Sequence, residues 1–152
     1  ASTLRPYCVS LLGDGTQRRS MAYVDNICQG LLLAAAAPHA SGETYWIADA
    51  RPYTLNEIVE TVTEVLESFG YACKGKQMRL PRAVGEVARI VDGALQGMGL
   101  YQQKIHVLGE MHQSIACSIA KAERELGYHP TVALRDGMQA SIEWCLANGH
   151  QI

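Results

Sequence analysis

Residues 18–40, RRSMAYVDNICQGLLLAAAAPHA, place two arginines before the longest apolar stretch of the chain. The alternating side chains of residues 20–24 predict a short strand, and Asp25 is of a residue type that caps helix N-termini. Pro38 ends the predicted helix because proline has no main-chain N–H to donate. The helix is apolar on every side, and such a helix must be covered on every side. We therefore expect it to lie inside a structure larger than a helical bundle.

Length and composition limit the possible classes of protein. The 152 residues predict one domain over 1–152, and a net charge of -2 argues against a nucleic-acid partner. The apolar stretch 27–37 is too short to cross a membrane, and no N-terminal signal pattern occurs. The five cysteines are widely spaced without a C-x-x-C pair, which indicates small buried side chains in a reducing compartment. We expect a cytoplasmic protein with no membrane partner.

Helices and strands alternate along the rest of the chain. The clearest helix begins at Thr54, where Glu57 completes a capping box, and ends at Gly70. A second long helix follows Pro81, and its inward face is predicted to carry Val84, Val87, Ala88, Val91, Leu95 and Met98. Further elements are expected as strands at 8–12, 44–48 and 77–80, a short helix capped by Ser118, and a helix over 134–147. This alternation indicates an α/β fold.

Several possible chemical motifs do not fit their patterns. The GDGTQR of residues 13–18 lacks the third glycine of a dinucleotide fingerprint and leads into a strand, so a tight turn is the better interpretation. His106 and His112 lack the spacing of a metal motif. Tyr101 and Lys104 are one residue too close for the tyrosine and lysine pair that transfers protons one helical turn apart. We predict no catalytic, cofactor-binding or metal-binding residue in this chain.

The arginine pair remains a candidate for anion binding. A guanidinium group can hold phosphate or carboxylate through two parallel hydrogen bonds. If residues 20–24 form a strand, Arg19 shares a face with Met21 and Tyr23 while Arg18 lies on the other face. The alternative is that both arginines are solvated charges after a turn, and the sequence leaves both interpretations open.

Several motifs, in order along the chain, carry a resemblance to a known family. GDGTQRRSMAYVDNICQGLLLAA, GETYWIAD with YTLNEI, the LP before the second long helix, and KAERELGYHP with GMQASIEW cover about residues 10–147. Together they resemble the C-terminal half of the extended short-chain dehydrogenases. This family includes NAD(P)-dependent sugar-nucleotide epimerases and dehydratases and 3β-hydroxysteroid dehydrogenase-like enzymes.

The resemblance implies an α/β fold that combines the last strands of a Rossmann-like sheet with a small substrate-binding lobe, the N-terminal cofactor-binding half being absent. It implies that Arg19 holds the diphosphate of a sugar nucleotide. It also implies that the step from Tyr23 to Asn26 opens the helix beneath the site. The implied substrate-binding residues are thus Arg19, Tyr23 and Asn26, and the apolar helix would pack on the Rossmann sheet.

Departures from the family pattern shape the expected function. The chain has no G-x-x-G-x-x-G and no Y-x-x-x-K, so NAD(P) is implied by the family only, and we expect no binding or catalysis without an N-terminal cofactor-binding half as partner. Residues 111–118 lack the second phosphate-binding arginine, which leaves a steroid-like substrate open beside a nucleotide sugar. The alternatives are a stand-alone small-molecule binding module and a self-assembling domain. Open strand edges and an uncovered helix face predict a homo-oligomer.

Overall fold

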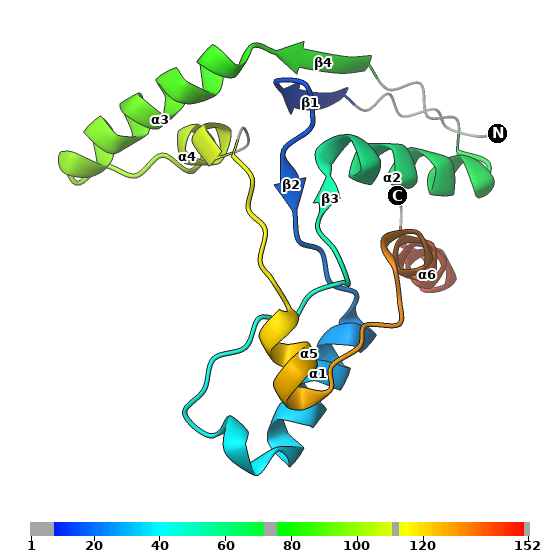
Figure 1. The fold of residues 1–152 in the computed structure, drawn as a ribbon. Helices are drawn as coiled ribbons and strands as arrows, with labels where there is room; N and C mark the ends of the chain where they lie inside the picture. Colours follow the sequence, from blue (N-terminus) through cyan, green and yellow to red (C-terminus); the bar gives the residue numbers. More distant parts are fainter. Residues whose placement is uncertain (1–7, 72–75, 111–112, 151–152) are drawn as a thin grey trace.

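The computed structural model describes residues 8–71, 76–110 and 113–150 (Figure 1). Its strands are β1 (Cys8–Leu12), β2 (Arg18–Arg19), β3 (Tyr53–Thr54) and β4 (Lys76–Leu80). Its helices are α1 (Val24–Ala36), the 3₁₀ helix η1 (Pro38–Ala40), α2 (Leu55–Ser68), α3 (Arg82–Gly97), α4 (Gln103–Glu110), α5 (Ala120–Leu126) and α6 (Leu134–Ala147). The described part of the chain is mostly helical and also contains these short strands, so the predicted α/β class is confirmed in its general form.

The strands form two small sheets. β1 and β4 are parallel, with Cys8 opposite Lys76, whereas β2 and β3 are antiparallel. An isolated bridge also joins Arg19 to Ile115. The predicted strands at 8–12 and 77–80 are thus confirmed. The predicted turn between the strand at 8–12 and the arginines is present as well. Both Gly13 and Gly15 adopt a φ of 76° that favours glycine.

Two predicted strands are wrong. Residues 20–23 and 43–49 lie outside helices and strands. The segment 20–23 makes main-chain hydrogen bonds from Ser20 N to Ile115 O and from Asp49 N to Met21 O. These isolated bonds do not build the repeated ladder that defines a strand, although the side chains have the composition of one.

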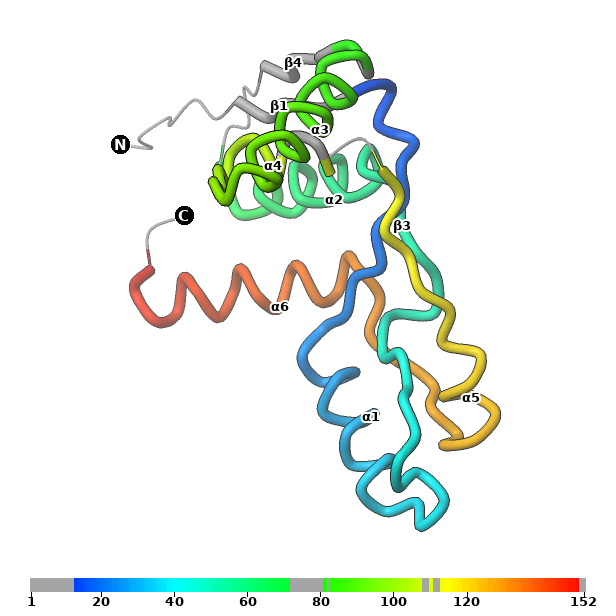
Figure 2. Tube along the Cα trace, turned by 90° about the vertical axis from the view of Figure 1, so that its left-hand side faces the viewer, coloured from blue at the N-terminus to red at the C-terminus, as the bar shows by residue number. Residues whose placement is uncertain are grey.

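The elements pack in pairs that leave the molecule open. α3 packs against α4, α2 against α6, and α1 against α5. Figure 1 shows β1, β4 and the helices α2 to α4 at one end, and α1 with α5 at the other, joined by extended segments. The view in Figure 2 places α6 alongside α2, between the two ends. A buried cluster at the α1 and α5 end contains Ala48, Ile119, Ala122, Leu126 and Tyr128.

The capping box predicted at the start of α2 is confirmed. Thr54 Oγ1 accepts a hydrogen bond from Glu57 N at 3.1 Å, and Glu57 Oε2 accepts one from Thr54 N at 2.7 Å. Arg51 donates to Glu57 Oε1 at 2.8 Å, and this bond together with the Thr54 main-chain bond lowers the pKa of Glu57 to about 2. Gly70, with a φ of 83°, follows the end of the helix as predicted.

The ends of the other helices differ in detail from the prediction. Tyr23 is the N-cap of α1 and makes no side-chain capping bond, so the predicted cap at Asp25 is wrong. Asp25 lies instead in the first turn, where a carboxylate favours the helix dipole. Pro38 follows the end of α1 as predicted. The predicted cap at Ser118 is also wrong by one residue: Ile119 is the N-cap of α5, and the Ser118 hydroxyl accepts a hydrogen bond from Ala120 N at 3.3 Å from just outside the helix.

The predicted inward face of α3 is only partly correct. Ala88 is buried and Leu95 half-buried, but Val87, Val91 and Met98 are 59%, 42% and 67% exposed. α3 packs against α4 and β1, and this contact is narrower than the apolar arc of the helix. In the described ranges, no helix combines the length and the apolar character that a membrane span requires.

Candidate functional site

Asn26 lies at the centre of a buried polar junction between α1 and the segment that precedes α6. Its side-chain nitrogen donates to Asp49 Oδ1 at 2.9 Å and to Val132 O at 2.7 Å. Its side-chain oxygen accepts from Thr131 N at 3.1 Å and Val132 N at 3.2 Å. An amide offers two donors and two acceptor positions, so the protein uses all four. Asn26 is 1% exposed, which makes this junction a fixed part of the fold.

Asp49 extends the junction toward two buried tyrosines. Its carboxylate accepts from Tyr23 N at 3.4 Å and is itself 4% exposed. Tyr53, whose hydroxyl accepts from Leu134 N at 3.2 Å, lies close enough to Asp49 for a hydrogen bond. Burial, with the nearby carboxylate, raises the pKa of Tyr53 and of Tyr128. Both phenols therefore keep their protons, and that of Tyr128 is donated to Ala48 O at 2.8 Å.

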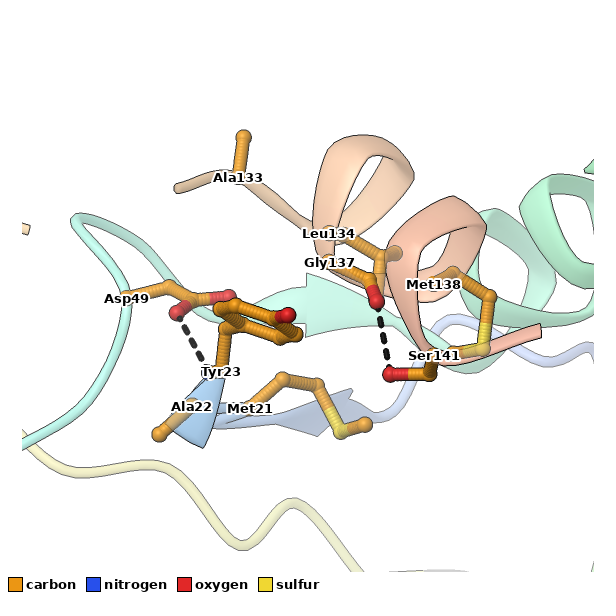
Figure 3. A pocket seen from close by; sticks show the side chains of 9 residues that line it. All are labelled: Met21, Ala22, Tyr23, Asp49, Ala133, Leu134, Gly137, Met138 and Ser141. Atoms are coloured by element: carbon orange, nitrogen blue, oxygen red, sulfur yellow. Dashed lines mark hydrogen bonds between the residues drawn. The ribbon is translucent and has the colours of Figure 1, made fainter. Parts of the chain in front are cut away.

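A small cavity adjoins this junction on the side of α6 (Figure 3). It has a volume of about 150 Å³ and is lined by Met21, Ala22, Tyr23, Asp49, Ala133, Leu134, Gly137, Met138 and Ser141. The Tyr23 ring lies against Gly137, where a Cβ atom would come within 2.8 Å of the ring. Glycine is therefore required for this contact, and the polar side chains at the cavity are those of Tyr23, Asp49 and Ser141.

A larger groove lies between three extended segments. Its volume is about 620 Å³, and its lining residues are Ser20, Met21, Ala22, Trp46, Ile47, Ala48, Ile115, Ala116, Cys117 and Ser118. Trp46 and Ile115 are 65% and 54% exposed at its surface. The volume falls within the range of about 300 to 1,000 Å³ that small-molecule sites occupy.

Arg19 is bound to main-chain carbonyl oxygens. Its guanidinium group donates to Glu110 O at 3.2 Å, to Gln113 O and to Arg18 O. Glu110 is the last residue of α4, and a cation is favourable at a helix C-terminus because the carbonyl groups there carry partial negative charge. The structure thus brings Tyr23 and Asn26 together at Asp49, whereas the guanidinium of Arg19 lies at the end of α4.

The sequence pattern did not identify the residues that complete the junction. Asp49 and Tyr53 were not singled out, although an acidic residue directly after the apolar run YWIA was a possible signal of a buried carboxylate. The prediction that the cysteines are buried is wrong for Cys28, which is exposed on α1, and only partly correct for Cys117 and Cys145, which are half-buried. Cys73 lies outside the described residues. Over the described ranges, no group of three histidine, cysteine or acidic side chains is placed to hold a metal ion.

The fold is similar to that of known sugar-nucleotide enzymes. UDP-glucuronic acid 4-epimerase from Bacillus cereus, solved in complex with NAD, aligns with a TM-score of 0.58 and 21% identity. The alignment covers 93% of this chain and 35% of the epimerase. At this identity the likeness concerns the fold alone. The chain thus has an α/β fold similar to part of a Rossmann-fold enzyme.

Sequence relatives define the family, although no family model matches the chain. An uncharacterized protein of Sinorhizobium fredii is 54% identical over 140 residues, which cover 91% of this chain and 39% of that protein. The 3 beta-hydroxysteroid dehydrogenase/Delta 5→4-isomerase of Mycobacterium tuberculosis is 32% identical over 153 residues, with 94% and 39% covered. The resemblance to part of the extended short-chain dehydrogenases is thus confirmed, and the chain spans about two fifths of the length of these two relatives.

Proposed function

We propose that this chain is the substrate-binding portion of an NAD(P)-dependent epimerase, dehydratase or dehydrogenase, and that it works together with a cofactor-binding half. The proposed substrate is a nucleotide sugar or a steroid-like alcohol. The observation that carries the proposal is the outer face of α1, where Val24, Ile27, Leu31 and Leu32 are 57%, 39%, 63% and 71% exposed. A helix that exposes large aliphatic side chains along its length is built to be covered by another structure.

The geometry of this outer face supports a protein partner. Val24, Ile27, Cys28, Leu31 and Ala35 follow the spacing of one helical face, and all of them are exposed. The one charged side chain of α1 is Asp25 in its first turn, next to this face, and the rest of the face is uncharged. Fully burying a large aliphatic side chain contributes roughly 1.5 to 3 kcal/mol. These side chains are already partly covered, so a partner that covers the whole face gains a fraction of this value from each of them. The chain spans 39% of its two relatives, which supports the remaining part of such a protein as the occupant.

The cofactor is proposed to be held by the partner half. In the described residues the turn at Gly13 and Gly15 leads to β2, so its main-chain N–H groups are not continued by a helix N-terminus that could receive a pyrophosphate. These residues do not fit a dinucleotide site. We therefore assign the hydride acceptor or donor to the partner half.

Within this chain, the substrate is proposed to lie in the 620 Å³ groove beside residues 20–22. Arg19 directly precedes this segment and would exchange its carbonyl partners for the oxygens of a diphosphate. Tyr23 and Asn26 complete the proposed substrate-binding set, with Tyr23 at the adjoining small cavity and Asn26 fixing the segment through its buried hydrogen bonds.

Reconstitution tests this function. The chain is mixed with the separately produced remaining part of the Sinorhizobium fredii relative and with NAD or NADP, and nicotinamide absorbance is followed with sugar nucleotides and hydroxysteroids. We expect an absorbance change only when both halves are present. No change in any combination, with both halves shown to be folded, would contradict the proposal.

Titration calorimetry separates the substrate classes and the alternative function. A UDP-sugar should lose most of its affinity in Arg19→Ala but not in Arg18→Ala, the exposed neighbour that serves as matched control. Hydroxysteroid binding that both variants retain would favour the steroid-like class. Binding to this chain alone, without activity in any mixture, would instead favour a stand-alone binding module.

A further inference from the structure

A histidine joins two carboxylates where α3 meets α4. His106 Nδ1, on α4, lies 2.8 Å from Asp92 Oδ2 on α3. Its other ring nitrogen, Nε2, lies 3.5 Å from Glu110 Oε1, one turn further along α4. Gln96 Nε2 donates to the same Asp92 oxygen at 2.8 Å. The imidazole is therefore the bridge between the two helices at this point.

The carboxylate of Asp92 makes this bridge energetically important. Asp92 is 7% exposed, and among the described residues its Oδ1 atom is buried with no hydrogen-bond partner. A buried carboxylate with an unsatisfied oxygen requires a nearby positive charge, because burial removes the water that would otherwise stabilise it. A protonated His106 supplies this charge.

Protonation also decides how many bonds the histidine makes. The imidazolium ion has N–H donors for both Asp92 and Glu110, whereas neutral imidazole has only one. The charged groups that act on His106 are Asp92 from α3 and Glu110 from α4 itself, and the Tyr101 ring lies 5.6 Å away. The hydrogen bond to Asp92 raises the pKa of His106 above the ordinary value of 6.5, partial burial opposes this, and both carboxylates add to the rise.

α4 depends on such contacts for its position. It has 8 residues, and a helix of this length is not stable by itself in water. Its contacts include the packing against α3 and the guanidinium of Arg19, which binds the main-chain carbonyl of Glu110 at its C-terminus.

We propose that His106 is a proton-operated clasp that holds α4 against α3, closed when the imidazole is protonated and loosened when it is neutral. Because Arg19 is bound at the C-terminal end of α4, opening of the clasp also frees its guanidinium from Glu110. The direction follows from linkage: a raised histidine pKa stabilises the closed state fully below pH 6.5, and this stabilisation is lost as pH rises through the pKa of the closed form. This inference does not depend on the proposed function.

Amide hydrogen exchange of the full chain tests the clasp. Protection factors, which are corrected for the intrinsic effect of pH, are measured for residues 103–110 and for α6 between pH 5.5 and 8.5. We expect protection of α4 to fall by roughly tenfold or more, as for the loss of a charge-assisted hydrogen bond, while α6 changes much less. Protection of α4 that stays constant over this range would overturn the proposal.

Variants assign the effect to this histidine. His106→Gln should give low protection of α4 that no longer depends on pH, while the control His129→Gln, an exposed site, should behave as wild type. Glu110→Gln removes a partner that is 52% exposed, so it keeps the fold and should move the midpoint of the α4 transition to lower pH. A pH response that survives in His106→Gln, or an unchanged midpoint in Glu110→Gln, would refute the clasp.

Discussion

The inner face of helix α1 is held by hydrogen bonds and close packing, whereas its outer face consists of aliphatic side chains that contact solvent. Asn26 and Gly30 are the buried residues of the helix, and both are small or polar. Leu31 and Leu32 are exposed, whereas Leu33 and Ala34 pack partly buried against the cluster of Ile119, Ala122 and Leu126. Apolar side chains thus lie on both faces of the helix. We propose that the inner face specifies the fold of this chain and that the outer face serves association.

The largest expected effect comes from breaking the inner face at Asn26. Asn26→Ala leaves the buried carboxylate of Asp49 and the partly buried main-chain groups of Thr131 and Val132 without their partner. We expect a loss of about 3 kcal/mol or more in the free energy of unfolding, measured by urea denaturation, because each unsatisfied buried group costs about 1 to 3 kcal/mol. Asn148→Ala, at an exposed position, should change stability by less than about 1 kcal/mol. An equally small effect of Asn26→Ala would remove the junction from the stabilising contacts.

A methyl group added at Gly30 tests the close packing of the inner face. A Cβ atom there would lie 2.8 Å from the Ile47 side chain, so Gly30→Ala should destabilise the protein by about 1 to 3 kcal/mol. Gly93 is also inside a helix, but a Cβ atom there meets nothing within 4 Å. Gly93→Ala should therefore stabilise the protein by up to about 1 kcal/mol through helix propensity. Thermal unfolding of both variants checks the opposite signs, and equal signs would show that the inner face is loosely packed.

A polar side chain at Leu31 tests the outer face. Leu31→Gln should change the free energy of unfolding by no more than about 0.5 kcal/mol, because the side chain is already 63% exposed. Association should nevertheless weaken. The chain alone is predicted to form a homo-oligomer, and light scattering at micromolar concentration should give a lower mass for the variant. A monomeric mass for the unchanged chain would contradict the predicted self-association.

The smallest expected effect lies outside α1, at the capping box of α2, and shows what a polar contact at the surface contributes. The pKa of Glu57 is lowered from 4.5 to about 2, so its stabilising effect is present above pH 4.5 and is lost as pH falls toward 2. Glu57→Gln should flatten the dependence of stability on pH in this range, measured by urea denaturation at each pH. The control Glu60→Gln, on the exposed side of the same helix, should retain the wild-type slope.

Local signals allowed much of the fold to be predicted. The capping box at Thr54 and Glu57, the stop at Gly70 and the range 134–147 depend on residues close together in the sequence, and each is confirmed. The strand predicted at 20–24 failed because a strand needs a partner along its length, and pairing partners cannot be read from one segment. For α3, periodicity identified the apolar arc but not which half of that arc would be covered.

The candidate site was harder to predict because its contacts join distant parts of the chain. Asn26 meets Asp49 across 23 residues and Val132 across 106. No local pattern marks such a junction, although the motif resemblance pointed to the step from Tyr23 to Asn26. The main-chain partners of Arg19 at Glu110 and Gln113 were likewise outside the reach of sequence periodicity.

The pairing of β1 with β4 sets an order for folding. Cys8 of β1 lies opposite Lys76 of β4, so this sheet forms only after the intervening chain has closed a long loop, which makes its contact order high. At a synthesis rate of about 5 to 20 residues per second, a ribosome exposes β1 several seconds before β4 follows. During this interval the edge of β1 is open to strands of other nascent chains, so dilute expression and slow translation initiation should favour the correctly paired sheet.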